Sequence, residues 1–155
     1  MKKLIFFITL FYCLLPKTVL SNESKRVNIY YDKNIVCVQR SNKCYAFAKG
    51  KASYPTPTWE GPQYLTTHIT NGFAWQNPLT GKVYPKGTHN LGDIWIQFYH
   101  DDKTGWSFGV HQTPEPNKPL SQQESHGCLR MNYTDLVNFS NELEYFDEFY
   151  IIRDN

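Results

Sequence analysis

Short apolar and alternating runs, separated by turn residues, make up most of the chain after residue 26. This pattern is typical of β-strands, because successive side chains of a strand point to opposite faces of a sheet. A pair of apolar runs within residues 35–47 flanks a polar turn, which predicts a β-hairpin. We expect further strands in these segments: 27–32, 64–69, 94–99, 105–111 and 148–152.

One segment has the period of a helix. Leu136, Phe139 and Leu143 are spaced so that they fall on one face of a helix over residues 133–143. Asn132 or Thr134 can cap its start. The fold class we expect is mainly β, a mostly antiparallel β-sandwich or barrel-like sheet with one short packed helix.

The region between these elements, residues 53–92, is rich in Pro, Thr, Asn and Gly. Loops of this length in a compact domain usually carry function, so we expect this region to cover a substrate site. Trp59 and Trp75 are its candidates for substrate contact, although tryptophans of β-rich domains more often fill the core. His89 is a further candidate for lining the site.

Charge is unevenly distributed along the 155 residues. Three of the 16 basic residues lie within residues 1–21, which leaves 13 against 14 acidic residues in the rest of the chain. A nearly neutral remainder argues against binding to nucleic acid, which needs clustered Lys and Arg to displace phosphate counterions. It argues equally against an acidic, disordered tail. Its length suits one globular domain.

The first 21 residues have the pattern of a secretory signal peptide. Lys2 and Lys3 precede an apolar run over residues 4–15, which Pro16 closes. The run is shorter than the roughly 20 residues that a membrane-spanning helix needs. We expect cleavage after Ser21, export to the periplasm or cell envelope, and no stable membrane insertion afterwards.

Export would place the later cysteines in an oxidising compartment, where disulfides form. Cys37 and Cys44 lie on the two arms of the expected hairpin, where cross-strand residues are close enough for a disulfide. A bonded pair and two buried thiols both fit this pattern. In either case Cys128 is left over, and an odd thiol in an exported protein is a candidate nucleophile.

Two histidines are candidates for the base that a cysteine nucleophile needs. His111 ends a predicted strand, and a loop of 13 residues, 112–124, can return the chain to Cys128. His126 lies two residues before Cys128, on the same face of an extended segment. Gly127 lets the backbone approach a substrate closely and can present N–H groups to a developing oxyanion.

Other chemistries fit the sequence less well. All five histidines precede Cys128, which excludes the papain-like order with its histidine after the cysteine. The sequence has no Cys-x-x-Cys or His-x3-His spacing, so we expect no metal site. A redox protein that uses Cys37 and Cys44 is a weak alternative, because their spacing lacks the motif that lowers a thiol's pKa.

The segment Ser125-His126-Gly127-Cys128-Leu129-Arg130, with Gly109-Val110-His111 upstream, resembles the signature of the YkuD-type L,D-transpeptidase catalytic domain. Pro55-Thr56-Pro57-Thr58 followed by Gly61 resembles the Thr-Pro-x-Gly segment of that family. The resemblance assigns residues 26–154 to the catalytic domain and implies an L,D-transpeptidase-like β-sandwich.

The resemblance also implies roles for individual residues. Cys128 is the nucleophile and His111 the general base, whose other ring nitrogen is held by a backbone carbonyl near Gln112. The backbone N–H groups around Gly127 and Cys128 form the oxyanion hole. Arg130 either braces the loop or meets a substrate carboxylate.

The remaining positions support these groups. Ser125 and His126 are expected to shape the site, and Trp59 and His89 to contact substrate. The sequence departs from the family pattern at Gln112, where a glycine often follows the histidine. It departs again where Trp59 and Glu60 delay the glycine after Thr-Pro.

The implied reaction is acyl transfer on peptidoglycan stem peptides, in cell-wall cross-linking or remodelling in a bacterial envelope. Thiolate attack on the bond to terminal D-Ala gives a thioester, which an amine of a second stem resolves. An L,D-carboxypeptidase or endopeptidase would use the same residues, and a non-catalytic wall-binding module would keep the fold alone. We expect no cofactor and a monomeric protein.

Overall fold

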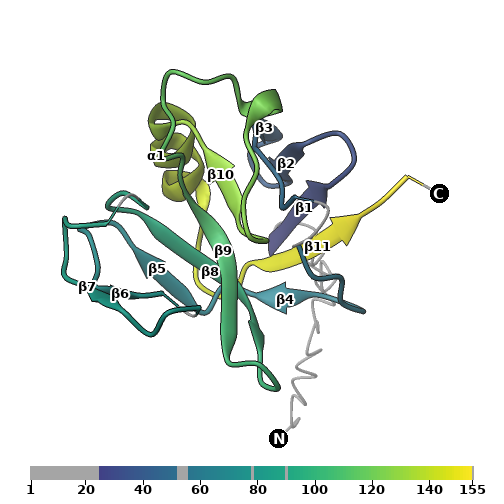
Figure 1. Ribbon diagram of the computed structural model, residues 1–155. Coiled ribbons are helices and arrows are strands. Elements are labelled where there is room, and N and C mark those ends of the chain that lie inside the picture. The colour runs from purple at the N-terminus through teal and green to yellow at the C-terminus, as the bar shows by residue number, and fades with distance from the viewer. Residues whose placement is uncertain (1–24, 52–55, 78, 90, 155) are drawn as a thin grey trace, which may run out of the picture.

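Two β-sheets, a separate two-stranded hairpin and one α-helix make up the structure (Figure 1). This computed structural model describes residues 25–51, 56–77, 79–89 and 91–154, so the expected signal peptide lies outside the described residues. Within those ranges, no helix is long and apolar enough to cross a membrane.

The first sheet has the strand order β3-β2-β1-β11-β4, and the second has the order β10-β9-β8-β5. The bounds in the first sheet are β1 (Arg26–Tyr30), β2 (Ile35–Val38), β3 (Lys43–Ala46), β4 (Gln63–Tyr64) and β11 (Glu148–Ile152). Those in the second are β5 (Thr67–Ile69), β8 (Trp95–Asp101), β9 (Trp106–Gln112) and β10 (Leu129–Met131). The remaining elements are β6 (Trp75–Gln76), β7 (Val83–Tyr84), the 3-10 helix η2 (Leu120–Gln122) and α1 (Tyr133–Glu142).

One hydrophobic core joins the two sheets and the helix. Alternating strand residues point into it because one face of each sheet turns toward the other sheet. Helix α1 adds Leu136 and Phe139, both fully buried, as the helical period predicts. The fully buried strand residues include Val27 and Ile29 of β1, Ile96 of β8, Val110 of β9, and Leu129 and Met131 of β10. The mainly β sandwich with one packed helix is therefore confirmed, and the barrel-like alternative is not what the chain forms.

Two of the strand pairs are parallel, β1 with β11 and β9 with β10, while the others are antiparallel. A parallel neighbour requires a long connection, because the chain must return to the same end of the sheet. Between β9 and β10 this connection is the segment 113–128, which contains η2. It returns the chain to the level of Val110, opposite which β10 begins.

The predicted strand over 64–69 is divided between the sheets. Leu65 is buried with 3% of its surface exposed, and its N–H donates to the Asp147 carbonyl beside the first sheet. The next N–H, from Thr66, donates to the Gln97 carbonyl in the second sheet. The chain crosses from one sheet to the other at this point, so alternation alone cannot separate β4 from β5. Asn132 is the N-cap residue of α1 but makes no side-chain capping hydrogen bond.

The hairpin of β2 and β3 carries the disulfide between Cys37 and Cys44. The two residues lie directly opposite each other, with their Cα atoms 4.1 Å apart. Cys128 is the free cysteine among the described residues.

Replacing both hairpin cysteines by alanine should lower the free energy of unfolding by about 2–3 kcal/mol, because the disulfide lowers the conformational entropy of the unfolded chain. Urea unfolding of the Cys37→Ala/Cys44→Ala variant beside the wild type measures the loss. An unchanged free energy of unfolding would show that the disulfide adds no stability.

Candidate active site

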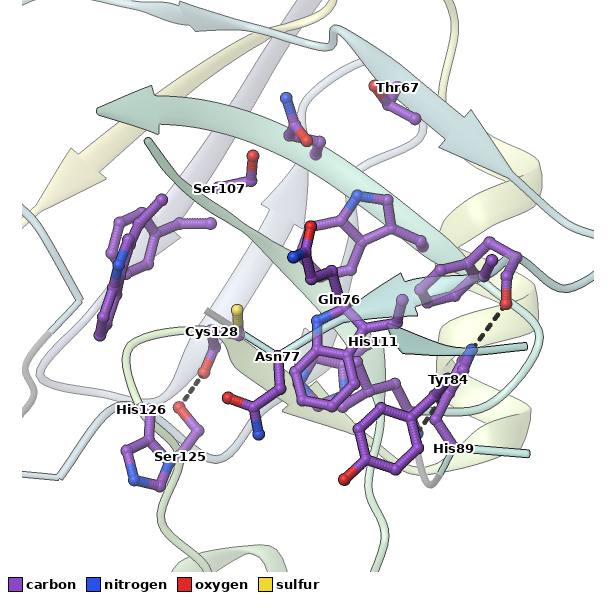
Figure 2. A pocket seen from close by; sticks show the side chains of 18 of the residues that line it. Thr67, Gln76, Asn77, Tyr84, His89, Ser107, His111, Ser125, His126 and Cys128 are labelled. Carbon is purple, nitrogen blue, oxygen red and sulfur yellow. Dashed lines mark hydrogen bonds between the residues drawn. The ribbon is translucent and has the colours of Figure 1, made fainter. Parts of the chain in front are cut away.

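A cavity of about 1040 Å³ lies against the second sheet (Figure 2). Its floor is the face of β5, β8, β9 and β10 that points away from the core, and its other wall is the hairpin of β6 and β7. We call residues 73–77 and 79–89, which carry β6 and β7, the roof hairpin. The cavity continues past His111 and Cys128 to the turn between β8 and β9, where residues 104–108 line it.

Strand register brings His111 and Cys128 to this floor. His111 pairs with Arg130 across the parallel strands β9 and β10, and their neighbours Val110 and Leu129 are fully buried in the core. Since side chains alternate along a strand, His111 and Arg130 point to the opposite side, into the cavity. Cys128 precedes Arg130 by two residues and lines the same cavity.

Gly109 lets the strands beneath Cys128 approach each other closely. A Cβ added to Gly109 would lie 2.1 Å from the Ile96 carbonyl oxygen, so no other residue fits there without moving β8. On the same strand pair, Trp95 lies opposite His111, and their rings stack with centroids 6.2 Å apart. The sequence did not single out Trp95 as a site residue, because it follows an ordinary strand pattern, and Gly109 entered only as part of the segment that resembles the family signature.

The protonation state of His111 follows from its contacts. Its side chain is almost fully buried, and its Nδ1 lies 2.7 Å from the carbonyl oxygen of Gln112. A carbonyl only accepts hydrogen bonds, so the proton of the neutral ring is on Nδ1 and the lone pair is on Nε2. Burial lowers the pKa of His111 to about 4; the Gln112 carbonyl opposes this shift, and the charge of Arg130 adds to it.

Burial acts in the other direction on the thiol. It raises the pKa of Cys128 to about 11, although a backbone hydrogen bond from Gly109 and the charge of Arg130 both lower it. With a histidine pKa of about 4 and a thiol pKa of about 11, both side chains are neutral at pH 7. The resting cavity therefore holds a neutral thiol and a neutral imidazole whose Nε2 carries the lone pair.

Ser125 holds the loop that presents Cys128. It is buried, its Oγ accepts the N–H of Gly127 at 3.1 Å, and its hydroxyl donates to the carbonyl of Cys128. Gly127 adopts a φ of 111°, which a residue with a side chain rarely does. Its N–H is bonded to Ser125 within the loop. Of the two N–H groups expected to form the oxyanion hole, that of Cys128 is the remaining candidate.

Thr56 anchors the same loop from the other side. Its side-chain hydroxyl donates to the Gly127 carbonyl at 2.5 Å, and its own N–H donates to the hydroxyl of Tyr31 at 3.3 Å. Thr56 is buried with 1% of its surface exposed. The sequence drew attention to Thr56 only through the resemblance of its segment, and the structure gives it a defined contact with the cysteine loop.

Gln123 organises the long connection between β9 and β10. Its side chain is buried, accepts a hydrogen bond from the Thr113 hydroxyl, and donates to the carbonyls of Glu115 and Lys118. A loop that passes over the protein must satisfy its own backbone groups, and Gln123 does this here. Sequence reasoning missed Gln123, because a glutamine in a polar loop usually points to solvent.

Arg130 contacts the long connection and also lines the cavity. Its side chain is 16% exposed, and one of its terminal nitrogens lies 3.8 Å from a carboxylate oxygen of Glu115. It also lines the cavity, and its Nε is buried without a hydrogen-bond partner in the described structure. Its pKa is lowered by burial. The guanidinium is thus held by the loop at the cavity wall.

The other expected site residues divide into two groups. His126 and His89 line the cavity, and Figure 2 shows both around the same space as Cys128. Burial and the charges of Lys51 and Arg130 lower the pKa of His126. Trp75 lines the cavity as well, stacked on Tyr84 of the roof hairpin with ring centroids 5.4 Å apart.

Trp59 is not brought to the cavity. Its ring stacks on Tyr99 with centroids 5.2 Å apart, and its Nε1 donates to the Phe149 carbonyl at 3.3 Å. It packs against the hydrophobic core, so the expected substrate contact of Trp59 is corrected to a packing role. Apart from the undescribed positions, the chain has no cluster of three or more His, Cys, Asp or Glu side chains that could hold a metal ion.

The alkylation rate of Cys128 should report its raised pKa. Because only about one thiol in ten thousand is ionised at pH 7 when the pKa is about 11, reaction with iodoacetamide should be slow there. The rate should rise about tenfold per pH unit up to pH 10 without a plateau. A plateau below pH 9 would contradict this electrostatic account, and a Cys128→Ala control identifies any background labelling.

The hydroxyl of Thr56 should stabilise the fold through its hydrogen bond and not only through the space that it fills. Thr56→Val keeps the shape but leaves the buried Gly127 carbonyl without its donor, so the free energy of unfolding should fall by about 1–3 kcal/mol. Thr56→Ser keeps the hydroxyl and should lose less. Urea unfolding of both variants makes the comparison, and equal losses would show that the hydrogen bond is not the cause.

Comparison with solved structures shows a shared fold at low sequence identity. L,D-transpeptidases from Stackebrandtia nassauensis and Mycobacterium tuberculosis (L,D-transpeptidase 1) match with TM-scores of 0.57 and 0.54 at 16% and 17% identity. A mutant L,D-transpeptidase from Enterococcus faecium matches with a TM-score of 0.59 at 15% identity. The matches cover 82% of this chain but 54%, 58% and 49% of those chains, so this chain spans about half their length.

Comparison with curated proteins finds no significant match. The family model for the L,D-transpeptidase catalytic domain, YkuD, matches residues 16–151, which is most of the sequence. The chain therefore belongs to the L,D-transpeptidase catalytic domain family.

Proposed function

We propose that this protein is a cysteine-dependent L,D-transpeptidase that acts on peptidoglycan stem peptides. The observation that carries the proposal is the pairing of β9 with β10, which puts Cys128 and His111 on the floor of one cavity. His111 has its proton on Nδ1, so its Nε2 is free to take a proton. Family membership supplies the substrate class, because L,D-transpeptidases act on peptidoglycan.

The first half of the reaction makes a thioester. The Cys128 sulfur attacks the carbonyl that joins the L-centre of a diamino acid to terminal D-Ala, while His111 Nε2 takes the thiol proton. The N–H of Cys128 donates to the developing oxyanion. The tetrahedral intermediate then breaks its C–N bond, and His111 returns the proton to the departing amine of D-Ala.

The second half transfers the acyl group. An amine of a second stem peptide attacks the thioester carbonyl, and His111 takes the proton that this amine loses. The C–S bond breaks and Cys128 recovers the proton, which leaves a cross-link and the starting enzyme. The cavity extends both under the roof hairpin and toward residues 104–108, which supports binding of two substrate chains.

Burial of the pair supports a proton transfer that is concerted with attack. A thiol with a pKa of about 11 and an imidazole with a pKa of about 4 rarely exchange a proton in the resting state. The charge of Arg130 lowers both pKa values, so it favours the thiolate and opposes the imidazolium. Its guanidinium lines the cavity, which supports a contact with a substrate carboxylate near the reacting bond.

Export fits the same proposal. We propose residues 1–21 as a signal peptide that takes the catalytic domain, residues 26–154, to the periplasm or cell envelope. Lys2 and Lys3 followed by an apolar run support this, as does a disulfide between Cys37 and Cys44, since disulfides persist in oxidising compartments.

Mass spectrometry of purified tetrapeptide-stem muropeptides, incubated with the protein, tests the function. Cross-linked dimers that depend on Cys128 are the expected product, whereas free tripeptide would identify the protein as an L,D-carboxypeptidase. Cys128→Ala should give no product, and His111→Gln should lower the rate by about 100-fold or more. Turnover that persists in Cys128→Ala would contradict the proposal, and inactivity of the wild type would favour the wall-binding module.

A further inference from the structure

A continuous chain of hydrogen bonds connects the roof hairpin to His111. The Nε2 of His89 lies 2.7 Å from the Phe73 carbonyl oxygen, and the Leu91 N–H donates to Nδ1 of His89 at 3.3 Å. The Leu91 carbonyl accepts the Gln112 N–H at 3.2 Å. The Gln112 carbonyl then meets Nδ1 of His111 at 2.7 Å. Four bonds thus link the entrance of the roof hairpin to the proposed base.

The direction of every bond in this chain is fixed. The Phe73 carbonyl only accepts, so His89 carries its proton on Nε2, and its Nδ1 is then free to accept from Leu91. Bonds that point the same way polarise one another and strengthen the chain. His89 therefore uses both ring nitrogens within the protein, which leaves neither for a substrate.

Packing follows the same path as the hydrogen bonds. The ring of His89 packs on Phe73 with centroids 4.6 Å apart, Phe73 packs on Trp95 at 6.0 Å, and Trp95 stacks on His111. These contacts join the roof hairpin to the floor beside the base. His89 and His111 are thus connected by packed side chains as well as by backbone hydrogen bonds.

Gln112 adds a contact specific to this sequence. Gly92, at a φ of +79°, lies against the Gln112 side chain, and a Cβ on Gly92 would be 2.5 Å from its Oε1. The backbone that leaves the roof hairpin is thus packed directly on the residue whose carbonyl holds His111. The departure from the family's usual glycine at position 112 provides this packing surface.

We propose that His89 is a positioning residue that ties the roof hairpin to His111 and keeps the His111 proton on Nδ1. The inference rests on the proposed function, since it assumes that His111 is the base. It replaces the expected substrate contact of His89. When the link is intact, the Gln112 carbonyl is fixed and Nε2 of His111 is held as the acceptor toward Cys128.

Two substitutions of His89 separate the two ends of the link. His89→Asn keeps an acceptor for the Leu91 N–H, because an Asn side chain bonds the N–H two residues later in an Asx turn. His89→Gln keeps a donor that can reach the Phe73 carbonyl but loses the acceptor near Leu91. His68→Gln is the matched control, because His68 bonds Ser140 of α1 on the other face of the sheet.

Nitrogen-15 NMR of the histidine side chains reads the His111 tautomer without any turnover. We expect His111 with its proton on Nδ1 in the wild type, His89→Asn and His68→Gln, and a mixture of tautomers in His89→Gln. With muropeptide substrate, His89→Gln should lose about tenfold in kcat with little change in KM, and His89→Asn should stay within about threefold of the wild type.

An unchanged His111 tautomer in His89→Gln overturns the proposal. It is also overturned if His89→Asn loses activity while His89→Gln keeps it, because His89 would then act only as an anchor for Phe73. If the wild type has no turnover, the proposed function fails, and the His111 tautomer in His89→Gln still decides the positioning role.

Discussion

The parallel pairing of β9 with β10 is the constraint on which the rest of the site depends. It sets His111 against Arg130 and so fixes the face on which Cys128 emerges, two residues earlier. Val110 and Leu129, buried on the opposite face, prevent a shift of register by one residue, since that shift would turn core residues toward the cavity. The hydrophobic core of the sandwich therefore holds the geometry of the polar site above it.

Burial affects both the protonation states of the cavity side chains and the hydrogen bonds that hold the loops around them. It gives a neutral thiol and a neutral imidazole at rest, so the proposed reaction needs a proton acceptor that the fold holds in place. The surrounding polar groups of Ser125, Thr56 and Gln123 are buried too, and they satisfy backbone groups of the loops. Their hydrogen bonds make the cysteine loop a fixed part of the protein.

Much of the fold could be predicted from sequence because local patterns set it: the hairpin over 35–47, the helix and the long strands follow apolar periodicity. His111 and Cys128, which line one cavity, were suggested by the odd thiol and by the resemblance of their segments to a family signature, and their catalytic roles stay a proposal. Trp59 was assigned wrongly, since sequence cannot tell a loop tryptophan that folds onto the core from one that faces a cavity. The contacts of Thr56, Gly109 and Gln123 depend on segments far apart in the chain, which no local pattern reveals.

The central claim is that Cys128 carries the acyl group. Intact-protein mass spectrometry after incubation with a tetrapeptide donor alone, stopped in acid and followed by peptide mapping, tests it most directly. The account predicts a mass increase equal to the donor less D-Ala, located at Cys128 and reversed by an added amine acceptor. A protein that releases product without such an adduct, or that carries it on another residue, would contradict the account.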